Sequence, residues 1–112
     1  MLQKSFIPLT VTILALLQPV ALAQTATYYS DEYQGQPTAS GELFNTWDYT
    51  AAHPNLPFGT WVEVTNLNNG SSVTVRINVR CNCGIDLSKA AAVSIDLIDM
   101  GVAPVSLKIL EQ

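Results

Sequence analysis

Hydrophobic and polar residues alternate along three stretches of the chain, at residues 60–65, 72–80 and 105–109. This alternation is typical of strands that are buried on one face. In the second stretch, Val73, Val75, Ile77 and Val79 form an apolar row, and the residues between them are polar. Asn69-Gly70 joins the first two stretches and favours a hairpin turn, because both residues tolerate positive φ angles. We therefore expect Val79 to extend an apolar core.

Two further elements complete the pattern. A strand is expected at residues 25–29, which are rich in Thr and Tyr, followed by a long polar loop. A helix is expected from about Lys89 to Asp99, with Ser88 as its N-cap and Gly101 as its stop. Several short strands and one helix in so short a chain predict a mainly β fold, a small β-barrel.

The first 23 residues have the composition of an export signal. Lys4 gives a positive start, an apolar run follows, and Ala21-Leu22-Ala23 has the small residues that a signal peptidase requires. The run is too short, and too interrupted by proline, for a transmembrane helix. We expect cleavage after Ala23, with an uncleaved anchor as the alternative. The mature domain is then residues 24–112, which would carry no membrane anchor.

The charge balance restricts the class of partner. The whole chain has 5 Lys and Arg residues against 9 Asp and Glu residues, a net charge of −4, and removal of Lys4 makes the domain more acidic. Such a domain is not expected to bind nucleic acid or an anionic membrane surface. It is compatible with a partner such as a glycan.

Three side chains are candidates for proton transfer, and each has an ordinary structural alternative. Glu42 follows a glycine in a polar turn, where a solvated carboxylate is common. His53 is the only histidine; this residue exchanges protons near neutral pH, but it often has only a hydrogen-bonding role. Asp86 lies two residues before the expected helix cap. There it either transfers protons or accepts hydrogen bonds from backbone N–H groups at the start of the helix.

Aromatic residues and cysteines form two further groups. The aromatic side chains are Tyr28, Tyr29, Tyr33, Trp47 and Trp61. They either pack the core or line a groove, where a ring offers a flat face to a sugar. Cys81 and Cys83 are the only cysteines. They form a disulfide with each other, remain free or pair with another chain, or bind a metal, although two thiols and one distant His fall short of the four ligands of zinc.

Five blocks of sequence run in order through nearly the whole mature chain, from about residue 26 to residue 110. They read A-T-Y-Y-S, Y-Q-G-Q-P-T-A-S-G-E, Y-T-A-A-H-P-N-L-P-F-G-T-W-V-E-V-T-N-L-N-N-G, V-T-V-R-I-N and I-D-L-S-K-A-A-A. Together they resemble the rare lipoprotein A family. The resemblance implies a six-stranded double-psi β-barrel, as in expansins and some lytic transglycosylases. It also implies cleavage of peptide-free peptidoglycan strands between N-acetylmuramic acid and N-acetylglucosamine, with a 1,6-anhydro product.

The resemblance also implies roles for individual residues. Glu42 and His53 match the carboxylate and the histidine of the family's motifs. Glu42 is therefore the expected proton donor, with a pKa raised in a groove, and His53 either orients it or relays the proton. Val79 stands where the family has an aspartate, and Asp86 is the candidate substitute. The expected glycan contacts are Tyr28, Tyr29, Tyr33, Thr38, Ser40 and Asn78.

The departure at Val79 leaves a second function open, an expansin-like module that binds glycan or loosens the wall without cleavage. In either case the resemblance implies peptidoglycan glycan strands as the partner. We expect no cofactor and no metal. The protein is expected to be a monomer, soluble after export, in the periplasm or secreted.

Overall fold

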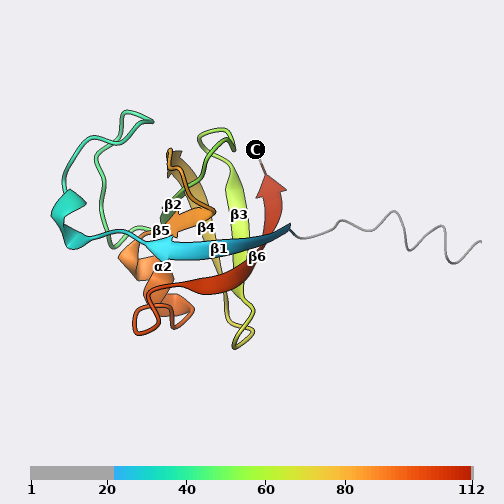
Figure 1. The fold of residues 1–112 in the computed structure, drawn as a ribbon. Coiled ribbons are helices and arrows are strands. Elements are labelled where there is room, and N and C mark those ends of the chain that lie inside the picture. The colour runs from blue at the N-terminus through green and yellow to red at the C-terminus, as the bar shows by residue number, and fades with distance from the viewer. Residues whose placement is uncertain (1–21, 112) are drawn as a thin grey trace, which may run out of the picture.

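Six strands close into a barrel in the computed structural model, which describes residues 22–111 (Figure 1). They are β1 (Leu22–Tyr28), β2 (Thr50–Ala52), β3 (Trp61–Asn66), β4 (Ser72–Val79), β5 (Ile85–Leu87) and β6 (Ala103–Glu111). Their order around the barrel is β1-β5-β2-β4-β3-β6. β1 is parallel to β5 and β2 is parallel to β4, whereas the other neighbouring pairs are antiparallel. The expected six-stranded double-psi β-barrel is confirmed.

Aliphatic side chains fill the inside of the barrel. Val62 and Val64 of β3 and Val75 and Ile77 of β4 are fully buried, as their alternation predicts. Full burial of one such side chain stabilises the fold by about 1.5–3 kcal/mol. Outward-facing residues of the same strands are thus left free to form a site on the surface of the barrel.

Helix α2 (Lys89–Ser94) is shorter than predicted. Ser88 caps it as expected, since its Oγ accepts the Ala91 N–H at 3.4 Å. The helix ends because Ile95 and Leu97 are both fully buried, and a continued helix would direct them about 200° apart. The residue between them, Asp96, has a φ angle of 57°. No helix in residues 22–111 is long and apolar enough to cross a membrane.

β1 begins three residues earlier than predicted. Leu22, Ala23 and Gln24 pair with Leu107, Ser106 and Val105 of β6. Residues 1–21, which hold most of the predicted export signal, lie outside the described residues. Cleavage after Ala23 remains a prediction, and it would leave β1 starting at Gln24.

The connection between β1 and β2 projects from one side of the barrel (Figure 1). It contains the short 3₁₀ helix η2 (Asp31–Tyr33) and then folds back on itself. Gly35 donates its N–H to Phe44 O at 2.8 Å, and Phe44 donates to Gln36 O at 2.8 Å. This folded connection forms one side of the site described next.

Candidate functional site

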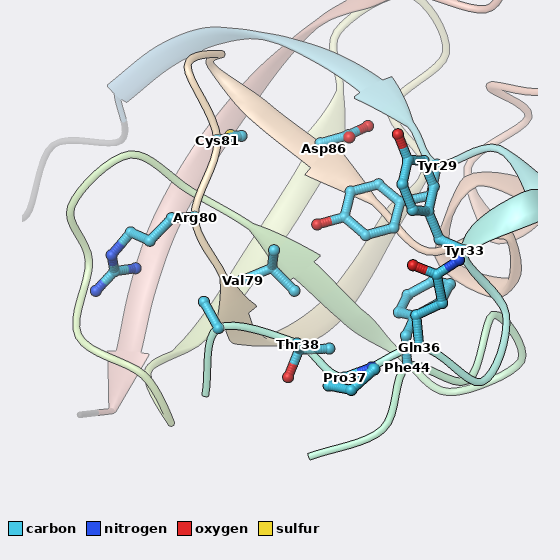
Figure 2. Close-up of a pocket in the computed structure, with 11 residues that line it drawn as sticks. Tyr29, Tyr33, Gln36, Pro37, Thr38, Phe44, Val79, Arg80, Cys81 and Asp86 are labelled. Atoms are coloured by element: carbon cyan, nitrogen blue, oxygen red, sulfur yellow. The ribbon is translucent and has the colours of Figure 1, made fainter. Parts of the chain in front are cut away.

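A cavity of about 380 Å³ lies between the β1–β2 connection and the adjoining ends of β4 and β5 (Figure 2). It is lined by Tyr29, Tyr33, Gln36, Pro37, Thr38, Ala39, Phe44, Val79, Arg80, Cys81 and Asp86. Its volume falls in the range of small-molecule sites, about 300–1,000 Å³. The cavity brings together five residues that were singled out from the sequence, namely Tyr29, Tyr33, Thr38, Cys81 and Asp86.

Asp86 supplies the only carboxyl group among the described residues that line the cavity. It lies at the centre of β5, beside Thr27 of β1 and Ala52 of β2. Thr27 Oγ1 donates a hydrogen bond to Asp86 Oδ1 at 3.0 Å, so its side chain binds a neighbouring strand and not the helix entrance. Burial raises the pKa of Asp86, against the opposing effect of the Thr27 hydrogen bond. Asp86 is therefore suited to hold a proton.

Val79 lines the cavity and does not extend the core, so the prediction for this residue was wrong. β2 and β4 shift register between Ala51 and Ala52, and Ala52 pairs with Val79. The extra residue, Asn78, makes a bulge that reverses the alternation of side chains at the end of β4. Val79 therefore lies in the same row as Asp86, with Ala52 between them. Two strand spacings separate Val79 from Asp86, roughly 10 Å.

Replacing Val79 with Asp is therefore expected to leave the fold intact, with a change in unfolding free energy within about 1 kcal/mol, as for other partly exposed sites. The matched control is Val75→Asp, which places an unpaired carboxyl in the closed core and is expected to prevent folding. Thermal unfolding followed by circular dichroism should show a cooperative transition for Val79→Asp and none for Val75→Asp. Equal loss of stability in the two variants would show that Val79 belongs to the core.

Three aromatic rings form one wall of the cavity. Tyr29 lies between Phe44 and Tyr33, with ring centroids 4.9 and 5.8 Å away. Burial, and then the charge of Asp86, raise the pKa of Tyr29, so its hydroxyl remains a hydrogen-bond donor. Tyr33 is 47% exposed, so it is accessible to a ligand in the cavity.

Three other aromatic side chains considered for a groove lie outside the cavity. Tyr28 packs against the core, and its hydroxyl donates to Ile98 O at 3.3 Å. Trp47 is exposed, with Lys89 Nζ 5.7 Å from its ring centroid. Trp61 is an exposed residue of β3. Tyr28, which was expected to contact a glycan, therefore does not line the cavity with Tyr29 and Tyr33.

Glu42 belongs to the turn at residues 38–42, but its carboxylate is bound by β4. Arg76 donates to both of its oxygens, at 3.0 and 3.2 Å, and Asn78 Nδ2 donates to Oε1 at 2.7 Å. These hydrogen bonds lower the pKa of Glu42, and the bond from Arg76 has the largest effect. Burial acts in the opposite direction, but its effect is smaller. The expectation of a raised pKa was wrong, because the groove supplies Glu42 with a cation. Glu42 is ionised near neutral pH.

The remaining polar residues of this region hold the turn in place. Asn78 is 2% exposed, and its carbonyl oxygen accepts the Ser40 N–H at 3.2 Å. Thr38 Oγ1 donates to Glu42 O at 2.7 Å and lies 2.8 Å from Ser40 Oγ. Asn78, Ser40 and Glu42 therefore fix the position of Thr38, which is the member of this group that lines the cavity.

The ion pair of Glu42 is expected to make stability depend on pH. A carboxyl group whose pKa is lower in the folded state stabilises the fold above its unfolded pKa, and this contribution is lost as the pH falls through the folded pKa. Wild-type protein should therefore lose Tm more steeply than Glu42→Gln between about pH 5 and about pH 2. The difference should be small, because the Glu42 side chain is 39% exposed. Parallel Tm curves would contradict the ion pair.

His53 lies beside Arg80, outside the cavity lining. Its Nδ1 accepts the backbone N–H groups of Asn55 and Leu56 at 3.3 and 3.2 Å. Burial, followed by the charge of Arg80, lowers the pKa of His53. The ring is thus neutral near neutral pH and carries its proton on Nε2. These contacts agree with the hydrogen-bonding alternative for His53.

Cys81 and Cys83 form a disulfide with each other, with Cα atoms 5.3 Å apart. Cys81 also lines the cavity, so the bridge constrains the loop between Val79 and Asp86. Within residues 22–111, no group of three or more His, Cys, Asp and Glu side chains is arranged to hold a metal ion.

Sequence reasoning did not identify Thr27, Phe44 or Arg80 as parts of the site. The alternation on β4 indicated that Arg76 and Arg80 face outward, but it did not indicate which groups their side chains contact. Phe44 lies in a connection without periodicity, where no pattern distinguishes a buried ring from an exposed one. Thr27 could have been found, since it alternates with the inward residues of the predicted first strand.

The closed barrel, its two parallel strand pairs and the outer cavity define a double-psi β-barrel with a ligand-sized site next to β5. A family model described as lytic transglycolase matches residues 21–107. The chain therefore belongs to this family, the rare lipoprotein A-like double-psi β-barrels.

Two relatives show how the chain compares in length. It is 57% identical over 86 residues to the probable endolytic peptidoglycan transglycosylase RlpA of Treponema pallidum, covering 73% of this chain and 27% of that protein. It is 45% identical over 86 residues to the uncharacterized protein ssl3177 of Synechocystis, covering 77% of this chain and 96% of that protein. The chain thus spans about a quarter of the named transglycosylase.

Two solved structures share the fold. Streptomyces papain inhibitor aligns with a TM-score of 0.68 at 26% identity, covering 82% of this chain and 96% of the inhibitor. A mutant expansin of Clavibacter michiganensis in complex with cellohexaose aligns with a TM-score of 0.67 at 19% identity, covering 82% of this chain and 51% of the expansin.

Proposed function

We propose that this chain is an endolytic peptidoglycan transglycosylase. It would cut peptide-free glycan strands between N-acetylmuramic acid and N-acetylglucosamine and leave a 1,6-anhydro end. Membership of the lytic transglycolase family and the name of the Treponema relative support this activity. The observation that carries the proposal is Asp86, a half-buried carboxyl group with a raised pKa beside an aromatic wall.

In the first half of the reaction, the carboxylic acid of Asp86 donates its proton to the glycosidic oxygen as the bond from that oxygen to C1 breaks. The raised pKa of Asp86 favours the protonated form that this step requires. Tyr33 would stack on a sugar ring, and the Tyr29 hydroxyl would donate a hydrogen bond to it.

In the second half, the 6-hydroxyl oxygen of the muramic acid attacks C1 and forms the anhydro bridge. Its proton passes to the Asp86 carboxylate, which restores the acid. No water molecule has to fit between two carboxyl groups, unlike in an inverting glycosidase. In this proposal one carboxyl group serves both steps, and the reaction requires no aspartate at position 79.

Glu42 and His53 act as positioning residues in this proposal. Glu42 is ionised and holds the turn that places Thr38 in the cavity wall. His53 fixes its own loop through Nδ1, and its carbonyl oxygen accepts a hydrogen bond from Arg80 at 3.4 Å. Neither residue is assigned a proton transfer to the glycan.

Digestion of purified peptide-free glycan strands, followed by mass spectrometry of the products, tests the activity. The expected products are fragments that end in 1,6-anhydro-muramic acid. Fragments with ordinary reducing ends would instead indicate hydrolysis, and would overturn the transglycosylase proposal.

The alternative function is a glycan-binding module without turnover, as in expansin-like proteins. The observation that favours it is Val79, which puts an apolar side chain in the cavity at the place of the family's aspartate. Binding of glycan strands with no anhydro products in the same digestion would select this alternative.

We also propose that the chain is exported, is cleaved after Ala23 and acts at the cell wall as a monomer. The apolar start of the sequence supports export. Amino-terminal sequencing of protein collected outside the cytoplasm is expected to begin at Gln24, and its elution in gel filtration should match one chain.

A further inference from the structure

A disulfide joins Cys81 and Cys83 in the loop of residues 80–84, which connects β4 to β5. The bridge closes a very short loop, because its cysteines are two positions apart. The stabilisation that a disulfide gives to a whole fold grows with the length of the loop that it closes. This bridge is therefore expected to add little to the stability of the barrel, and its effect is local.

The two ends of this loop are fixed by the barrel. Ala52 of β2 pairs with Val79 just before the loop and with Asp86 just beyond it. Gly84 packs so closely against β1 that an added Cβ atom would collide with the carbonyl oxygen of Thr25. Only the middle of the loop can therefore change shape without opening the barrel.

The middle of the loop has few other restraints. Among the described residues, no backbone hydrogen bond outside the helices and strands involves residues 80–84. The loop also carries the hydrogen bond from Arg80 Nη1 to His53 O. Cys81 forms part of the cavity wall, on the loop that leads from Val79 toward the strand of Asp86 (Figure 2). The disulfide is thus the main restraint on this part of the wall.

The bridge is accessible to a reductant, because Cys81 and Cys83 are both partly exposed. Exposed disulfides are in general easier to reduce than buried structural ones, and they serve more often in regulation. A dithiol reduces such a bridge in two exchanges. One of its thiolates attacks a bridge sulfur, which forms a mixed disulfide and releases one cysteine. Its second thiol then displaces the other cysteine, so two electrons and two protons pass to the protein and the dithiol ends as a disulfide.

We propose that the Cys81–Cys83 bridge is a redox switch that acts on the cavity, an inference that rests on the proposed function where it concerns glycan. The oxidised protein holds the loop in the shape that completes the cavity wall. Reduction by a dithiol breaks the covalent link across the loop and allows Cys81 to leave the wall. A sugar that enters the reduced cavity must first order this loop, so the reduced protein binds glycan more weakly. The barrel itself stays closed in both states.

Reduction of the full chain with dithiothreitol tests the switch. Thiols are counted by alkylation with iodoacetamide and mass spectrometry, and the cavity is followed through backbone amide signals in NMR. We expect two alkylated thiols in the folded protein, with shifts of the signals of Val79 and Asp86 but not of Val64, which is buried in the core. Binding of peptide-free glycan strands should weaken about tenfold, the effect of one modest ordering cost.

Two variants separate the switch from other effects of the reductant. Cys81→Ser combined with Cys83→Ser should behave as the reduced protein does and should not respond to dithiothreitol. Asn82→Ala, which changes the exposed residue between the cysteines and keeps the bridge, should respond as wild type does. The switch is overturned by a bridge that stays intact in the folded protein, by unchanged NMR signals on reduction, by unfolding of the reduced protein, or by equally tight glycan binding in both states.

Failure of the switch and failure of the proposed function give different results, because thiol counting and NMR need no turnover. If the signals shift on reduction but neither form binds glycan or yields anhydro products, the proposed function fails and the redox response of the cavity stands. If the signals do not shift and anhydro products form at equal rates in both states, the switch fails and the transglycosylase proposal stands.

Discussion

Replacing Asp86 with Asn is expected to reduce the formation of 1,6-anhydro ends by about 100-fold or more, the usual contribution of a general acid. Asn has nearly the same shape and can still accept the Thr27 hydrogen bond, but its amide cannot donate a proton as a carboxylic acid does. The rate is measured by quantifying anhydro ends in timed digestions of peptide-free strands.

Stability and a second variant serve as controls for this result. The raised pKa of Asp86 means that its ionised form is less favourable in the folded state. The ionised Asp86 therefore lowers the free energy of unfolding. This loss is absent at pH values below the pKa of Asp86 in the unfolded chain, and it grows as the pH rises through the pKa in the folded protein. Asp86→Asn should thus be at least as stable as wild type near neutral pH. Glu42→Gln should lose only about tenfold in rate, through displacement of its turn. Full activity of Asp86→Asn together with an inactive Glu42→Gln would reverse the two assignments.

Replacing Gly84 with Ala is expected to destabilise the fold by about 2–3 kcal/mol, at the upper end for an overpacked site. A Cβ atom at Gly84 would meet the backbone of Thr25 in β1, including its carbonyl oxygen. Backbone cannot move aside as a flexible side chain can, so β1 and β5 must separate. Because β1 and β5 carry Thr27 and Asp86, the variant should also lose activity.

Gly70→Ala is the matched control for this substitution. Gly70 lies in the turn between β3 and β4 with a φ angle of 78°, and an added Cβ there meets no atom within 4 Å. Alanine at this position must adopt a left-handed backbone conformation, which is expected to lower the free energy of unfolding by about 1–2 kcal/mol. Denaturant unfolding of both variants gives the comparison. A Gly84→Ala variant as stable as wild type would show that β1 and β5 do not approach so closely.

The barrel was predictable where strands are long enough to alternate. Residues 61–66 and 72–79 reveal their buried faces because several inward positions recur with period two. β2 and β5 have three residues each, which is too few for a period, so only the family resemblance implied six strands. Helix α2 ended early because the burial of Leu97, a tertiary effect, overrode the helical preference of the local sequence.

Sequence reasoning named several of the residues that line the cavity, but it did not indicate the contacts that determine their chemistry. The alternation of apolar and polar residues placed Val79 in the core. The bulge that moves it out cannot be recognised from the sequence of β4 alone, because it depends on how β4 pairs with β2. Glu42 was expected to be the acid because it matches the carboxylate of the family's motif. The sequence did not reveal its cation, Arg76, which lies 34 positions away and meets Glu42 only in the folded chain. Asp86 acquired its raised pKa in the same way, by burial between β1 and β2.

The central claim is that Asp86 holds the proton and Glu42 does not. Titration of the side-chain carboxyl carbons by NMR, in the folded protein with both residues assigned, measures this directly. The pKa of Asp86 should lie above the ordinary value of about 3.9, and the pKa of Glu42 should lie below the ordinary value of about 4.3. An Asp86 that titrates at or below its ordinary value, with Glu42 above its own, would contradict the assignment of Asp86 as the proton donor.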